Sequence, residues 1–172
     1  GGDLFHCFWL PDGGLFLGIG DVAGKGVPAA LMMAATATLI KGMAAATPDP
    51  ADLLGRVNSE LCAMSEELLF VTLFAAVLNP ATGELIFSNA GHNPPLIRRA
   101  DGRTQFMTVT PGLALGVEAE WRYVPAREHL APGDILLLYT DGVTEAMNVA
   151  FECFEPHRLL EVSRVADIAS PR

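Results

Sequence analysis

Positive charge is scarce in this sequence. Its 172 residues contain 11 Lys and Arg against 20 Asp and Glu, so the formal net charge is −9. No run of basic residues offsets this balance, and the phosphate backbone of a nucleic acid repels such a chain. We therefore expect no nucleic-acid partner. An anionic substrate would need a local cationic device, and a bound metal ion is the simplest one.

Cysteines and long apolar segments are scarce as well. Cys7, Cys62 and Cys153 lie far apart, which favours reduced core thiols in a cytoplasmic protein over a disulfide or a zinc site. The longest uncharged stretch, 27–40, is shorter than the ~20 residues of a membrane helix. We expect no membrane span in this sequence. We also expect no signal peptide, and the sequence contains no Walker A motif.

What the chain does contain is enough apolar sequence for one globular domain over residues 1–172, since 51% of it is hydrophobic. Its first residues already resemble a strand, and it ends as abruptly. Both features are expected of a fragment of a larger protein.

Turn residues divide the sequence into hairpins. Apolar runs at 4–10 and 15–19 flank Pro-Asp-Gly-Gly, and runs at 70–78 and 84–89 flank Pro-Ala-Thr-Gly, so each pair predicts a β-hairpin. Hairpins imply antiparallel pairing, which indicates an α+β fold.

Helices and further strands complete the expected elements. Proline and capping aspartates predict three helices, at 28–46, from Asp49 or Asp52 to about 64, and at 156–165. We expect more strands at 94–99, 121–126 and 135–139. The last of these is an uninterrupted apolar run, which is typical of a central strand.

Three aspartates, Asp3, Asp21 and Asp141, each adjoin glycine beside an apolar run. A carboxylate in such a setting is costly to bury without a partner, and hard divalent cations are the usual partner of clustered aspartates. If the first hairpin is centred on Asp12, Asp3 lies directly opposite Asp21. A two-residue loop at Asp12 and Gly13 would instead place Asp3 one step away, opposite Val22. We favour the first register, although like charges at ~5 Å need a cation between them.

Five motifs together resemble the SpoIIE/RsbU branch of the metal-dependent (PPM, or PP2C-like) serine/threonine phosphatases. They are GGDLF (1–5), GDVAGKGVPAAL (20–31), FVTLF (70–74), NAGHNPP (89–95) and YTDGVTEA (139–146). The resemblance implies a four-layer αββα sandwich, in which two antiparallel sheets are flanked by helices.

The resemblance also implies a site for two Mn²⁺ or Mg²⁺ ions. Asp3 and Asp21 would hold the metals with the main-chain carbonyl of Val22, and Asp141 would bind the second ion. Such ions acidify water and offset charge on a phosphoryl group. His92 would be either an acid for the leaving serine oxygen or a residue that orders its loop, and Asn89 is expected to bond within that loop.

Two positions depart from the family pattern. His6 stands where the family has a second acid, which could change metal affinity. The final Asp-Asp-x-Thr strand, which supplies a further carboxylate in the family, is not matched, because Asp167 has a different context. Without that strand the second metal should bind weakly.

By resemblance, the substrate is a phosphorylated protein of the anti-sigma-factor antagonist type, and an upstream sensor or receiver domain regulates the enzyme. The first rival is a degenerate phosphatase-like module that binds a partner without turnover. The second is a two-metal phosphohydrolase acting on a nucleotide or small molecule, for which the sequence offers no base pocket.

Overall fold

A computed structural model describes residues 2–64 and 69–165. The chain divides into two compact units. Unit 1 comprises Gly1–His92 and Val109–Leu130, and unit 2 comprises Asn93–Thr108 and Ala131–Arg172. Each unit contains one antiparallel sheet with a helical cover, so the predicted α+β class and the two helix-flanked sheets are confirmed.

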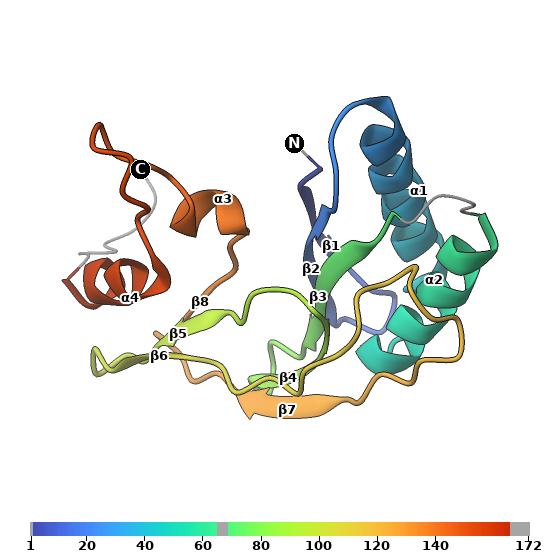
Figure 1. The fold of residues 1–172 in the computed structure, drawn as a ribbon. Helices are drawn as coiled ribbons and strands as arrows, with labels where there is room; N and C mark the ends of the chain where they lie inside the picture. Colours follow the sequence, from blue (N-terminus) through green and yellow to red (C-terminus); the bar gives the residue numbers. More distant parts are fainter. Residues whose placement is uncertain (1, 65–68, 166–172) are drawn as a thin grey trace. The chain divides into compact units, whose positions relative to one another are not determined.

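Unit 1 is built on a five-stranded sheet in the order β1-β2-β3-β4-β7 (Figure 1). The strands are β1 (Leu4–Trp9), β2 (Leu15–Val22), β3 (Val71–Leu78), β4 (Glu84–Ala90) and β7 (Ala126–His129). Both predicted hairpins form, β1 with β2 and β3 with β4. In the first turn the Asp12 carboxylate accepts a hydrogen bond of 3.0 Å from the Gly14 amide.

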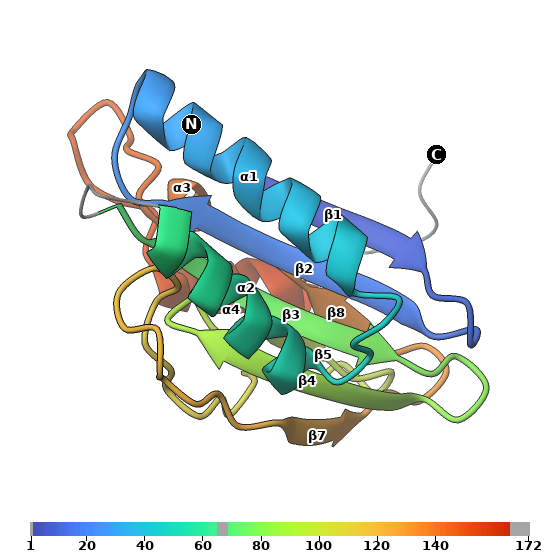
Figure 2. The ribbon, with the colours of Figure 1, turned by 90° about the vertical axis from the view of Figure 1, so that its right-hand side faces the viewer.

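Two helices, α1 (Val27–Met43) and α2 (Pro50–Met64), cover one face of this sheet (Figure 2). Alternate strand residues such as Leu4, Phe16 and Val22 join the helices in one buried core, as the two-residue period of a strand requires. Asp49 caps α2 as predicted, because its carboxylate accepts a 2.8 Å bond from the Ala51 amide.

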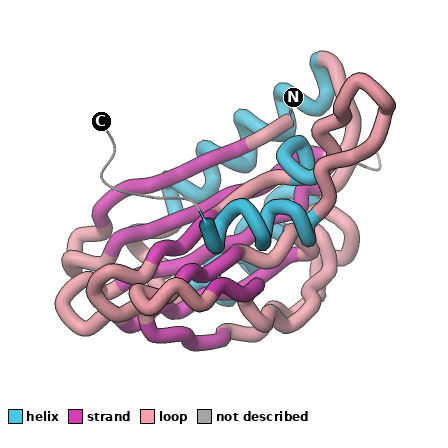
Figure 3. The backbone as a smooth tube through the Cα atoms, turned by 90° about the vertical axis from the view of Figure 1, so that its left-hand side faces the viewer, coloured by secondary structure: helices cyan, strands magenta, loops and turns pink. Residues whose placement is uncertain are grey.

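Residues 107–125, which precede β7, form a long loop, drawn like all loops in pink in Figure 3, and α2 holds it through one buried amide. Asn58 is 0% exposed. Its Nδ2 donates to the Glu118 carbonyl at 2.7 Å, and its Oδ1 accepts from the Gly116 amide at 2.9 Å. Leu115, next to Gly116, exchanges two main-chain hydrogen bonds with Val71 at the start of β3.

Unit 2 contains a three-stranded antiparallel sheet in the order β6-β5-β8. Its elements are β5 (Leu96–Arg98), β6 (Thr104–Phe106), β8 (Ile135–Leu137), the short α3 (Asp141–Thr144) and α4 (Pro156–Val165). Helix α4 packs on β5 and β6 around a small core of Leu96, Tyr139 and Leu159.

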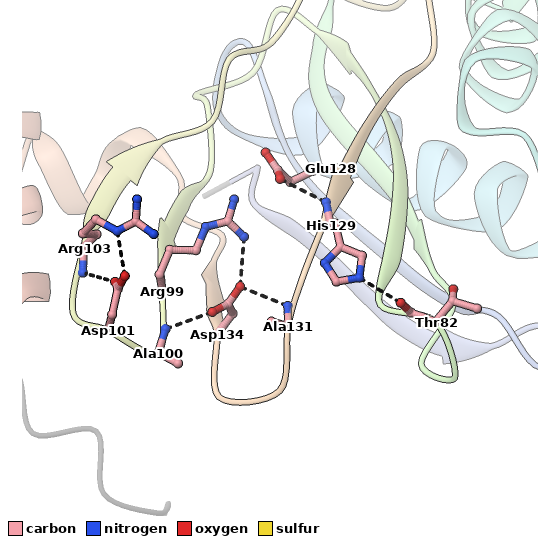
Figure 4. A network of polar contacts seen from close by, with 9 residues as sticks. All are labelled: Thr82, Arg99, Ala100, Asp101, Arg103, Glu128, His129, Ala131 and Asp134. Atoms are coloured by element: carbon pink, nitrogen blue, oxygen red, sulfur yellow. Dashed lines mark hydrogen bonds and ion pairs between the residues drawn. The ribbon is translucent and has the colours of Figure 1, made fainter.

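Asp134 fastens two turns of unit 2 (Figure 4). Its side chain is 3% exposed. The carboxylate accepts hydrogen bonds from the Arg99 guanidinium at 2.9 Å, the Ala100 amide at 2.9 Å and the Ala131 amide at 3.0 Å. The Arg99 contact is the main reason why the pKa of Asp134 is lowered. Figure 4 also shows the His129 imidazole of unit 1 against the Thr82 carbonyl. The His129 Nε2 lies 3.0 Å from that carbonyl oxygen.

Several predictions about strands are wrong. Residues 121–125 form no strand, because they belong to a loop in which the Tyr123 hydroxyl bonds the Leu113 carbonyl; β7 begins only at Ala126. β8 lies at an edge of its sheet rather than in the centre, and β6 was not predicted. Asp167 lies outside the described residues.

The three cysteines form no disulfide with one another, and Cys7 is exposed rather than part of the core. Within 2–64 and 69–165, no helix combines the length and the apolar character that crossing a membrane requires.

Candidate metal centre

The register of the first hairpin decides how two of the predicted ligands are placed. Leu4 pairs with Gly20 and Trp9 with Leu15, and the Val22 amide donates a 3.4 Å hydrogen bond to the Gly2 carbonyl. Continued by one residue, this register sets Asp3 directly opposite Asp21. The register centred on Asp12 is therefore confirmed.

Directly opposed residues of an antiparallel pair share one face of the sheet. Leu4 and Val22 point into the helix-covered core, so their neighbours Asp3 and Asp21 lie on the opposite face. Asp3 is exposed and Asp21 is partly buried. Two carboxylates in this position repel each other, and a cation between them would reverse the sign of that interaction.

Gly2 leaves space beside the oxygen atoms that would face such a cation. A Cβ atom on Gly2 would lie 3.0 Å from each of three atoms: the Asp21 Oδ1, the Val22 carbonyl oxygen and the Val22 Cβ. These two oxygens therefore border the same small volume, which any side chain at position 2 would fill. Carboxylate and carbonyl oxygens suit Mg²⁺ or Mn²⁺, so the donor set of unit 1 fits a hard divalent ion.

Asp141 belongs to unit 2, where it is the first residue of α3 and is exposed. The Thr144 hydroxyl and the Glu145 amide both donate to its main-chain carbonyl, at 3.2 and 2.7 Å. Among the residues that the structure describes, no three His, Cys, Asp or Glu side chains gather as a metal site. The strand register puts Asp3 opposite Asp21, and the Asp21 Oδ1 and the Val22 carbonyl oxygen both lie beside Gly2. The metal-binding roles of Asp3, Asp21, Val22 and Asp141 stay predictions.

His6 lies on the helix-covered face, two residues beyond Leu4, and so on the opposite side of the sheet from Asp3. Its ring meets Phe8 edge-on at 5.9 Å between centroids. Burial, and then the nearby Lys41 ammonium, lower the pKa of His6. His6 therefore packs β1 against α1 and does not replace an acid on the face of Asp3 and Asp21.

The loop after β4 is ordered by the side chain of Asn89, as predicted. Its Nδ2 donates to the His92 carbonyl at 2.9 Å, and its Oδ1 accepts from the His92 amide at 3.2 Å. The His92 imidazole is buried, and its Nδ1 lies 2.9 Å from the Thr72 hydroxyl. Thr72 in turn donates to the Asp21 carbonyl at 3.3 Å.

Thr72 was missed at the level of sequence. The available signal was a hydroxyl residue inside the apolar run FVTLF, one of the five motifs. The pairing of Thr72 with Asp21 across β2 and β3 could be read only from the fold.

Comparison with protein families gives an independent result. A family model described as Stage II sporulation protein E (SpoIIE) matches residues 11–171. The phosphoserine phosphatase RsbU of Bacillus subtilis is 30% identical over 144 residues, which are 84% of this chain and 43% of RsbU.

Two solved structures are similar in fold and sequence. The RsbU and RsbW domains of Rv1364c from Mycobacterium tuberculosis match 95% of this chain and 42% of that one, with a TM-score of 0.78 and 31% identity. The SiaA-PP2C domain of Pseudomonas aeruginosa matches 95% of this chain and 65% of its own, with a TM-score of 0.81 and 26% identity. The chain thus spans less than half of RsbU and of the Rv1364c chain.

Proposed function

This chain belongs to the SpoIIE family, and on that premise we propose that it is a metal-dependent protein phosphatase domain acting on phosphoserine or phosphothreonine. The observation that carries the proposal is the hairpin register, which sets Asp3 opposite Asp21. Gly2 adds to it, because it leaves room beside the Asp21 carboxylate and the Val22 carbonyl.

Asp3, Asp21 and the Val22 carbonyl would hold the centre of two Mn²⁺ or Mg²⁺ ions, and Asp141 would bind the second ion. When bound, such ions lower the pKa of water and offset the charge of a phosphoryl group. The residues of the chain would hold these ions and orient them. Asp3 and Asp21 would present their carboxylates from two paired chain segments, so the backbone would need little reorganisation to bind a cation.

The substrate in this proposal is a phosphorylated protein, of the anti-sigma-factor antagonist type, in the cytoplasm. An upstream sensor or receiver domain would regulate the activity. A relative named as a phosphoserine phosphatase supports the substrate class, since it matches 84% of the chain. The net charge of −9 fits a design in which cations, rather than a basic surface, attract the phosphate.

The proposal is tested by phosphate release from a phosphoserine peptide, measured with and without Mn²⁺. We expect turnover that requires Mn²⁺ and that Asp21→Asn reduces by at least about a hundredfold, a loss of ~2.7 kcal/mol of transition-state stabilisation. Asp12→Asn is the matched control, because it makes the same change in the turn of the same hairpin. It should keep wild-type turnover.

Calorimetric titration with Mn²⁺ separates the proposed enzyme from a degenerate binding module. The enzyme should bind Mn²⁺ in a manner that depends on Asp21, whereas the module would not. Turnover without added metal, or equal turnover by Asp21→Asn, would refute the proposal. A chromogenic phosphate ester hydrolysed while the phosphopeptide is not would favour a small-molecule phosphohydrolase.

A further inference from the structure

Two of the five motifs have no role in the proposed chemistry, although the structure joins them. FVTLF contributes Thr72 from β3, and NAGHNPP contributes His92 from the loop after β4. The Thr72 hydroxyl contacts the His92 Nδ1 at 2.9 Å and the Asp21 carbonyl at 3.3 Å. The chain of contacts therefore runs from His92 through Thr72 to the strand that carries Asp21.

The protons in this chain can be assigned by counting donors. A threonine hydroxyl has a single proton, and a main-chain carbonyl can only accept. If Thr72 donates to Asp21, the proton between Thr72 and His92 must come from the imidazole. In that arrangement His92 would be the Nδ1–H tautomer.

The peptide group between Asp21 and Val22 is held from both ends. Its carbonyl, on Asp21, accepts from Thr72, and its amide, on Val22, donates to the Gly2 carbonyl at 3.4 Å. Because a peptide group is planar, these two bonds fix the orientation of the whole unit. That unit links the residue whose carboxylate would bind the metal, Asp21, to Val22. The Asp21 Oδ1 and the Val22 carbonyl oxygen each lie 3.0 Å from the Cβ position of Gly2.

We propose that Thr72 and His92 are a positioning pair for the metal centre. The His92 Nδ1–H donates to the Thr72 hydroxyl, and the hydroxyl donates to the Asp21 carbonyl, which holds the end of β2 in the geometry that a divalent cation needs. The inference rests on the proposed function. The Asn89 side chain hydrogen-bonds the main-chain amide and carbonyl of His92, so the backbone that carries the imidazole is itself held in place.

Mn²⁺ alone, titrated by calorimetry into the full chain, tests the effect of the pair. Thr72→Val keeps the shape of the side chain and removes the hydroxyl, and we expect it to weaken Mn²⁺ binding by about tenfold, as is usual when a partner of a metal ligand is lost. Thr72→Ser should restore wild-type affinity. Loss of packing alone would not give this difference between Val and Ser.

Ser88→Ala is the matched control for the lost hydroxyl. Ser88 is 2% exposed and donates to the Val124 carbonyl at 3.0 Å, but it points to the helix-covered face of the same sheet. It should lower the free energy of unfolding without changing Mn²⁺ affinity.

A second measurement tests the pair without metal. Nitrogen-15 NMR of the imidazole at about pH 8, above the ordinary histidine pKa, should show His92 as the Nδ1–H tautomer, and Thr72→Val should change its shifts. An Nε2–H tautomer would overturn the proposal. Equal Mn²⁺ affinity of the wild type and Thr72→Val would also overturn the positioning pair, but it would leave the phosphatase proposal intact. Absence of any Asp21-dependent Mn²⁺ binding by the wild type would overturn both.

Discussion

The buried amide of Asn58 gives the sharpest test of how the fold is held, and we expect Asn58→Ala to lower the free energy of unfolding by about 2–4 kcal/mol. The change removes bonds of 2.7 and 2.9 Å to the Glu118 carbonyl and the Gly116 amide. Each buried group left without a partner costs ~1–3 kcal/mol. Glu118 is exposed and Gly116 partly so, so water recovers part of that cost.

Urea unfolding with linear extrapolation measures this loss, and calorimetry should show a Tm lower by about 5–15 °C. Hydrogen exchange should also quicken at Leu115 and Val71, which pair where the loop meets β3. Ser59→Ala removes an exposed hydroxyl of the same helix, which donates to the Gly55 carbonyl at 3.2 Å and to the Ala119 carbonyl of the loop at 3.4 Å. Because water can replace these exposed contacts, this change should alter stability by less than ~0.5 kcal/mol. A loss below ~1 kcal/mol for Asn58→Ala would refute the view that this side chain anchors the loop.

Three further predictions concern the site and the two units. Gly2→Ala should weaken Mn²⁺ binding on the order of tenfold in calorimetry, because its Cβ would lie 3.0 Å from the Asp21 Oδ1; unchanged affinity would contradict this. Burial lowers the pKa of His6, so the unfolded state binds its proton first, and stability to urea should fall as pH drops below ~6.5; His6→Phe should flatten that dependence. The Arg99 contact lowers the pKa of Asp134 in the folded protein. The stabilisation from this contact is therefore present above about pH 3.9 and is lost as the pH falls through the pKa of the folded state. Asp134→Asn should have a lower free energy of unfolding than the wild type near neutral pH and should lose less of it on acidification. Acid-unfolding curves that run parallel for the two proteins would contradict this prediction.

Local patterns were sufficient for much of the fold. The turn residues predicted both hairpins of unit 1, and Pro156 marked the start of α4. The opposition of Asp3 and Asp21 was accessible for the same reason, since a hairpin register depends only on the turn between its strands.

Contacts between distant segments were not accessible from the sequence. Nothing near Asn58 in the chain indicates that it binds a loop some sixty residues away. The segment 121–126 resembles a strand, although the Tyr123 hydroxyl donates a hydrogen bond within a loop. β8 is apolar throughout, yet an apolar run does not say whether one or two strands will flank it.

The pairing of β1 with β2 limits how the first turn can evolve. Side chains alternate between faces along a strand, so inserting or deleting one residue between Trp9 and Leu15 would exchange the faces of every β1 side chain relative to β2. Asp3 would then enter the helix-packed interior and Leu4 would emerge into solvent. If Asp3 and Asp21 serve the proposed metal centre, the length of that turn should therefore matter more for metal binding than the identity of its residues.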